Sequence, residues 1–175
     1  MIRYLVLTAC WAPHTSPPDN RVVATNGDVE LTTSSWKGTD SPLRTELCAA
    51  SHDEQQPFHI TAAQATKRYG IGITHLYSNG SSERRPIEVC GPANELRWLA
   101  QARCDDGSNP YDGKLRRAHQ HRQRAISYLE PCTPDIDVYD ARCPEATYYV
   151  YMDMDFCAPG EDMQELNKAT RYPDE

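Results

Sequence analysis

The clearest pattern of apolar and polar positions lies near the C-terminal end of the chain. Between residues 147 and 156, one set of alternate positions is apolar or aromatic. Its members are Tyr148, Val150, Met152, Met154 and Phe156. A period of two over about ten residues predicts a half-buried strand. Residues 135–139 alternate too, with Ile136 and Val138 directed inward, and residues 142–145 supply a turn. The pattern predicts a C-terminal β-hairpin.

Helical patterns precede this hairpin. A Thr-Ala-Ala-Gln sequence at 61–64 has the form of a capping box and predicts a short helix over 62–69, ended by Gly70. Apolar residues recur at helical intervals over 94–103 and again over 114–130, which predicts a helix in each segment. A turn of helix is also expected after Ser41 and Pro42.

Two more hairpins are expected. The Val-rich segment 21–33 surrounds an Asn26-Gly27 pair, which is a hairpin signal. The β-prone runs 71–77 and 86–90 flank a flexible turn and form the second. The predicted fold class is therefore α+β: mainly antiparallel β-hairpins with two or three helices packed on one face, disulfide-stabilised.

Composition limits the size of the core. The chain has 175 residues, enough for one domain, and only 39% of them are hydrophobic, with a mean hydropathy of −0.71. A polar chain of this length indicates a thin core that needs cross-links. The net charge of −7 argues against nucleic acid and anionic lipid as partners. We expect a single domain over 21–160 and an acidic tail over 161–175.

Cysteine usage indicates the compartment. The seven cysteines are Cys10, Cys48, Cys90, Cys104, Cys132, Cys143 and Cys157. They include no C-x-x-C pair, so a structural zinc site is not expected. Scattered cysteines in a small polar chain favour disulfides, which imply an oxidising compartment. The alternative is a cytosolic protein with reduced, buried thiols.

The N-terminal segment accounts for the odd cysteine. Arg3 precedes a short apolar run that ends in Leu7-Thr8-Ala9-Cys10. This tetrapeptide resembles the lipobox of bacterial lipoproteins. The resemblance implies that the segment before Cys10 is removed and that Cys10 carries lipid. Residues 1–10 would then be a signal segment, and the proline-rich residues 11–20 a tether. The alternative is a first β-strand over residues 3–8.

Six cysteines remain for three disulfides, and geometry excludes some pairs. A helix separates Cys90 from Cys104 by roughly 15 Å, whereas a disulfide needs Cα atoms within about 7 Å. Predicted strands likewise separate Cys143 from Cys132 and from Cys157.

The hairpin register favours one pairing among the rest. If Tyr139 lies opposite Tyr149 rather than Thr147, Cys132 falls opposite Phe156 and a Cys132–Cys157 bridge is predicted. Two sets then remain open for the other cysteines: Cys48–Cys90 with Cys104–Cys143, or Cys48–Cys104 with Cys90–Cys143.

The hairpin also carries the candidate binding residues. Its pairing would gather acids and tyrosines on the face away from the core. They are Asp135, Asp137, Asp153, Asp155, Tyr149 and Tyr151, with Tyr139 beside them. Like charges across a ladder repel, so water, a cation or the bases of residues 114–124 must relieve them. A solvated or arginine-paired face and a cation or ligand site both remain open.

Other chemical signals are weak. His119 and His121 would diverge on a helix, which favours surface histidines over a metal site. The acidic loop 105–109, with Asp112, resembles a calcium loop but lacks EF-hand spacing, which favours a surface turn. Hydrolase, zinc-protease, phosphate-loop and dinucleotide motifs are absent from the sequence.

Two functional classes follow from these observations. The first is an exported, membrane-tethered binding or interaction module, such as an inhibitor or immunity-type lipoprotein. The second is an exported hydrolase that uses the paired carboxylates of the final hairpin. We expect no cofactor, an unknown protein or small-ligand partner in the cell envelope, and membrane attachment only through a lipid anchor.

Overall fold

The computed structural model describes four stretches of the chain. They are residues 29–31, 38–50, 57–128 and 132–163. The predicted signal segment, the tether and the Asn26-Gly27 turn lie outside the described residues, as does the acidic tail beyond Met163.

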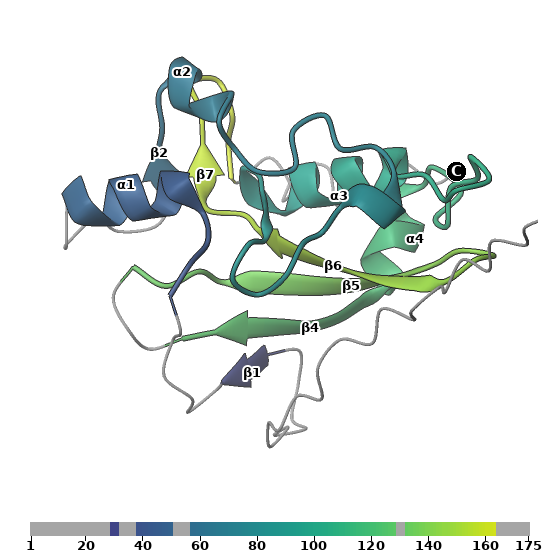
Figure 1. Ribbon diagram of the computed structural model, residues 1–175. Coiled ribbons are helices and arrows are strands. Elements are labelled where there is room, and N and C mark those ends of the chain that lie inside the picture. The colour runs from purple at the N-terminus through teal and green to yellow at the C-terminus, as the bar shows by residue number, and fades with distance from the viewer. Residues whose placement is uncertain (1–28, 32–37, 51–56, 129–131, 164–175) are drawn as a thin grey trace, which may run out of the picture.

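A five-stranded mixed sheet forms the centre of the molecule, in the order β1-β4-β5-β6-β3 (Figure 1). Its strands are β1 (Val29–Leu31), β3 (Ile87–Glu88), β4 (Arg122–Ser127), β5 (Ile136–Arg142) and β6 (Thr147–Asp153). The three central strands are antiparallel, while β1 and β3 join the edges in parallel. Strands β2 (Phe58–His59) and β7 (Phe156–Cys157) pair separately, also in parallel.

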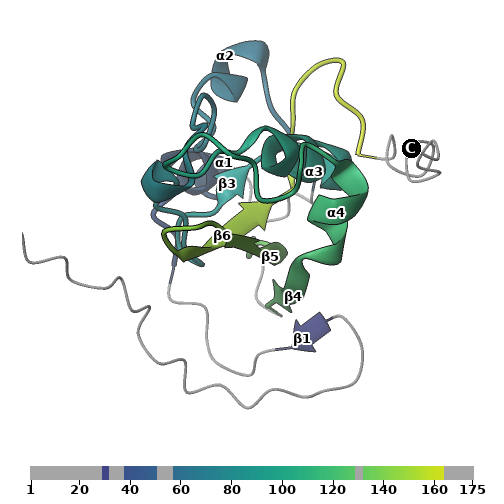
Figure 2. The ribbon, with the colours of Figure 1, turned by 90° about the vertical axis from the view of Figure 1, so that its right-hand side faces the viewer.

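The longer helices cover one face of this sheet. The helices are α1 (Pro42–Ala50), α2 (Ala62–Ala65), α3 (Gly91–Gln101) and α4 (Leu115–Gln120). Figures 1 and 2 show α3 and α4 together above the sheet, and α1 at its opposite end. Leu96 and Leu99 of α3 and Ala118 of α4 pack there against Val150 and Met152 of β6. The predicted α+β class is confirmed.

The C-terminal hairpin is confirmed, with a register that differs from both predicted ones. Tyr139 pairs with Val150, not with Thr147 or Tyr149. A shift by an odd number of residues exchanges the two faces of one strand relative to the other. Tyr139 therefore lies in the helix-covered core, while Val138 is buried on the opposite face.

Two predicted elements are wrong. The expected hairpin of 71–77 with 86–90 does not form, because Leu76–Ser78 is a 3-10 turn and β3 pairs in parallel with β6. The expected helix over 114–130 stops at Gln120, and the chain continues as strand β4.

Local helix signals were more reliable. The capping box is present, since the Thr61 hydroxyl accepts from the Gln64 backbone N–H and the Gln64 side chain accepts from the Thr61 N–H. Helix α2 is nevertheless shorter than predicted and ends at Ala65. The helix over 94–103 is confirmed as α3, although it begins earlier, at Gly91.

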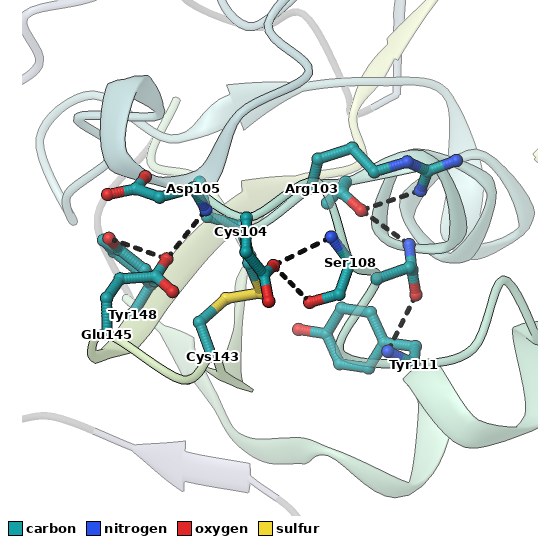
Figure 3. Close-up of a disulfide and its surroundings, with 12 residues drawn as sticks. Arg103, Cys104, Asp105, Ser108, Tyr111, Cys143, Glu145 and Tyr148 are labelled. Carbon is teal, nitrogen blue, oxygen red and sulfur yellow. Dashed lines mark hydrogen bonds between the residues drawn. A yellow bond between two sulfur atoms is a disulfide. The ribbon is translucent and has the colours of Figure 1, made fainter.

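Three disulfides cross-link the described residues, which indicates an oxidising compartment. They join Cys48 to Cys132, Cys90 to Cys157 and Cys104 to Cys143, with Cα–Cα distances of 6.0, 4.5 and 5.6 Å. Figure 3 shows the third of these bridges.

The predicted Cys132–Cys157 bridge is wrong. Strand β5 begins at Ile136, so Cys132 lies before the hairpin ladder, where it contacts α1 instead. Cys157 lies in β7 and pairs with β2, beside Cys90. One of the two predicted sets contains the observed Cys104–Cys143 bridge. The other bridges in both sets are wrong.

Candidate functional site

The acids of the final hairpin do not share one face. Because Tyr139 pairs with Val150, Asp137 lies opposite Met152 on the helix-covered face, and Asp153 lies opposite Ile136 on the other. The predicted arrangement of one acidic, tyrosine-bearing surface is therefore wrong. Its cause is the one-residue difference in register.

The remaining predicted site residues are also dispersed. Asp135 is exposed and accepts a hydrogen bond from the Ser127 hydroxyl. Tyr149 is 50% exposed, whereas Tyr151 is half-buried and its backbone N–H donates to the Ser81 hydroxyl. A binding role for these residues stays a prediction.

Asp153 and Asp155 belong to a buried ion cluster centred on Arg44 of α1. The Arg44 Nη2 lies 2.6 Å from Asp153 Oδ2 and 3.2 Å from Asp155 Oδ2. The guanidinium also lies over the rings of Phe58 and Phe156, at 4.9 and 5.1 Å from their centroids. All three charged side chains are almost inaccessible to water, so the cluster joins α1 to the end of β6.

Burial is the largest influence on the pKa values of the two aspartates in this cluster. It raises the pKa of Asp155 to about 8, with the Asp153 charge adding to the rise and Arg44 opposing it. Burial also raises the pKa of Asp153, against the pull of Arg44. Glu88, which binds the Ser41 hydroxyl and the Tyr69 backbone N–H, has its pKa raised for the same reason.

A second polar cluster lies under α3. Both carboxylate oxygens of Asp137 accept from Arg122, through Nε and Nη2, each at 2.7 Å. Behind this pair, the Tyr139 hydroxyl donates to Glu95 Oε2 at 3.0 Å. Glu95 is fully buried, and burial together with the nearby Asp137 charge raises its pKa well above the usual range. The Arg122–Asp137 pair confirms that a base from 114–124 relieves one of the hairpin acids.

Asp140 lies next to this cluster on β5. Its carboxylate accepts hydrogen bonds from Arg142 and from Gln123. One of its oxygens, Oδ1, also lies 3.0 Å from His121 Nδ1. Burial acts to raise the pKa of Asp140, but the bonds from Arg142 and His121 outweigh it and lower that pKa. His119 is exposed on α4, as expected for a surface histidine, whereas His121 lies just after the helix and is half-buried beside Asp140.

A small pocket lies beside Asp137 and Asp140, because their partners Arg122 and Gln123 contribute to its lining. Its lining is His119, Arg122, Gln123 and Arg124, and its volume is about 130 Å³. The register between β4 and β5 shifts between Arg122 and Arg124, which marks a β-bulge. Bulges are frequent beside functional sites because they redirect side chains. We take this pocket, at the junction of α4 and β4, as the candidate functional site.

Sequence reasoning missed this pocket because it placed residues 121–130 in a helix. From the sequence, the basic residues of 114–124 are expected only as partners for the hairpin acids. The available signal was Ile126, whose β-propensity was outweighed by its match to helical spacing.

The acidic loop after α3 is a surface turn, as favoured from the sequence. Asp106 accepts from Ser108, and Asp112 pairs with Arg117. The Asn109 amide donates to backbone carbonyls at the end of α3, including that of Ala102 at 2.6 Å. The side chains of Asp106, Asp112 and Asn109 therefore form hydrogen bonds and an ion pair that stabilise the turn.

Within the described residues, one group has metal-ligand spacing. It consists of Cys104, Cys143 and Glu145. The two sulfurs form a disulfide, so they are not thiolate ligands. Glu145 instead accepts from the Asp105 backbone N–H and from Tyr148 (Figure 3). This geometry fits a structural cross-link.

Comparisons of the chain with protein families, with curated proteins and with solved structures give no match. Within the described residues, no helix combines the length and apolar character required to cross a membrane.

Proposed function

We propose that this protein is an exported binding or interaction module, tethered to a membrane by lipid on Cys10, and that the α4–β4 pocket lies in its binding surface. The three disulfides support export. The lipobox-like Leu7-Thr8-Ala9-Cys10 and the proline-rich residues after it support the tether. An inhibitor or immunity-type lipoprotein is one form that such a module takes.

The observation that carries the proposal is the use of the hairpin carboxylates as structural partners. Asp137 gives both oxygens to Arg122, and Asp153 and Asp155 share one nitrogen of Arg44. Carboxylates held in this way support packing rather than attack on a substrate. The α4–β4 pocket, by contrast, is lined by polar side chains.

The alternative is an exported hydrolase that uses Asp153 and Asp155. One observation favours it: burial raises the pKa of Asp155 to about 8, which suits a general acid. Against it, the two side chains are only 1% and 4% exposed. A substrate would have to displace Arg44 to reach them, so the binding module is the better-supported function.

Photo-crosslinking tests the binding surface. A benzoylphenylalanine at His119, which is exposed on α4, should give a defined adduct in the native envelope. The matched control is the same residue at Ala49, exposed on α1 at the other end of the sheet (Figure 1). Adducts at both positions alike, or at neither, would contradict the proposed surface.

Metabolic labelling tests the anchor. The wild-type protein should incorporate an alkyne fatty acid, and Cys10→Ser should abolish the label. Equal labelling of both proteins, or no label on either, rules out an anchor at Cys10.

A further inference from the structure

The three disulfides differ in how far their cysteines are exposed. Both cysteines of one bridge, Cys48 and Cys132, are half-buried. Each of the other bridges contains at least one fully buried cysteine, because Cys90 and Cys157 are 0% and 3% exposed and Cys104 is 1% exposed. Disulfide exchange requires a thiolate to reach a sulfur atom. Among the bridges of the described residues, Cys48–Cys132 therefore offers the best access to an attacking thiol.

The backbone at Cys132 is the second distinguishing feature of this bridge. Its φ is 62°, in the left-handed region, where the Cβ of an L residue crowds the following carbonyl oxygen. Within the described residues, Asp112 is the other non-glycine residue with a positive φ, and an aspartate side chain can offset the strain by local hydrogen bonding. Strained or exposed disulfides are reduced more easily than buried, relaxed ones. Opening of the bridge frees Cys132 from the constraint that the bridge imposes.

Helix α1 has other attachments that do not depend on this bridge. Arg44 forms buried ion pairs with the two aspartates at the end of β6. Leu43 and Leu47 lie in an apolar cluster with Phe58. Figure 1 shows α1 at the end of the sheet where β4 ends and β5 begins. Because these contacts hold α1 in place, the bridge can open while the chain stays folded.

We propose that the Cys48–Cys132 bridge is a thiol–disulfide exchange site that takes a protein dithiol as its partner, while the other two bridges are structural. A thiolate of the partner attacks one sulfur of the bridge and forms a mixed disulfide, and the other cysteine leaves as a thiolate. The second thiolate of the partner then attacks the mixed disulfide and releases the remaining cysteine.

This exchange is balanced. The partner ends as a disulfide, and Cys48 and Cys132 end as thiols. Two electrons pass from the partner to the bridge, and the two protons that the dithiol loses equal the two that the cysteines gain. The site goes beyond the proposed binding function and does not depend on it.

A redox titration of the wild-type protein tests the inference. The folded protein is equilibrated with mixtures of reduced and oxidised dithiothreitol, free thiols are blocked with N-ethylmaleimide, and mass spectrometry measures the blocked fraction at each cysteine. We expect Cys48–Cys132 to be half open at a ratio of reduced to oxidised dithiol at least about tenfold lower than for either other bridge, a difference of about 30 mV or more. NMR should show a folded core at that ratio.

A trapping experiment tests the partner chemistry. The probe is a thioredoxin whose resolving cysteine is replaced by serine, so that the mixed disulfide persists. The adduct should map to Cys48 or Cys132. Cys48→Ser with Cys132→Ser should abolish it, whereas the matched control, Cys104→Ser with Cys143→Ser, should form it as the wild type does. Peptide mapping of the wild-type adduct decides the question if a double variant does not fold.

Two results would overturn the inference. One is a titration in which another bridge opens at the same ratio as Cys48–Cys132 or at a lower one, including the opening of all three together with loss of the fold. The other is a wild-type protein that gives no adduct with the probe, or an adduct at a different cysteine. Either result leaves the binding surface tested at His119 unaffected.

Discussion

At the scale of single residues, the acids of the hairpin could be recognised from the sequence, whereas their partners could not. Alternating aspartates in a strand require compensation, and that requirement is visible in the pattern. Arg44 lies 109 positions before Asp153, in a helix with no local sign of its role. Only the fold brings the two together.

Removal of Arg44 tests its structural role. Arg44→Ala leaves Asp153 and Asp155 buried without their cation, so we expect the free energy of unfolding to fall by about 3–5 kcal/mol. Urea denaturation measures this change. The exposed control Arg116→Ala, on α4, should alter stability by less than about 0.5 kcal/mol. Similar losses in both variants would mean that the Arg44 cluster contributes little.

Glu95 gives a pH-dependent signature. Its pKa is raised in the folded protein by burial and by Asp137, so above its unfolded pKa the folded state holds a proton that the unfolded state has lost. Stability should therefore decrease as pH rises above the unfolded pKa of Glu95. Glu95→Gln should make that decrease shallower, by at most about 1.4 kcal/mol per pH unit. Urea unfolding at several pH values measures both slopes, and identical slopes would contradict a protonated Glu95.

At the scale of elements, patterns with a single reading predicted the correct type of element, although β6 ends at Asp153 and not at residue 156. The strict alternation of 147–156 and the capping box at Thr61 specify a strand and a helix start. Segment 114–130 is ambiguous, because its apolar positions satisfy helical spacing while the β-branched Ile126 also suits a strand. Pairing with β5 decides the outcome, and that information is not local.

The capping box allows a small, local test. Thr61→Ala removes the hydroxyl that accepts from the Gln64 N–H, so we expect a loss of about 0.5–1 kcal/mol in unfolding free energy. Thr61→Ser keeps the hydroxyl and should be nearly neutral. Thermal unfolding compares the two variants. A loss in Thr61→Ser equal to that in Thr61→Ala would show that the methyl group matters and the cap does not.

At the scale of the whole molecule, cross-links compensate for a thin core. The three disulfides span 84, 67 and 39 positions, and long closed loops restrict the unfolded chain strongly. The polar composition predicts that the fold needs cross-links, and three disulfides are present. The pairing was not predictable, because it depends on a hairpin register and on a parallel β2–β7 contact that no short pattern specifies.

Non-reducing peptide mapping of the native protein tests the central claim, an exported and disulfide-stabilised module, most directly. The account predicts linked peptides for Cys48–Cys132, Cys90–Cys157 and Cys104–Cys143. It also predicts an N-terminal peptide that begins at lipid-modified Cys10. Free thiols at the six paired positions, together with an unmodified Cys10 in an unprocessed chain, would contradict it.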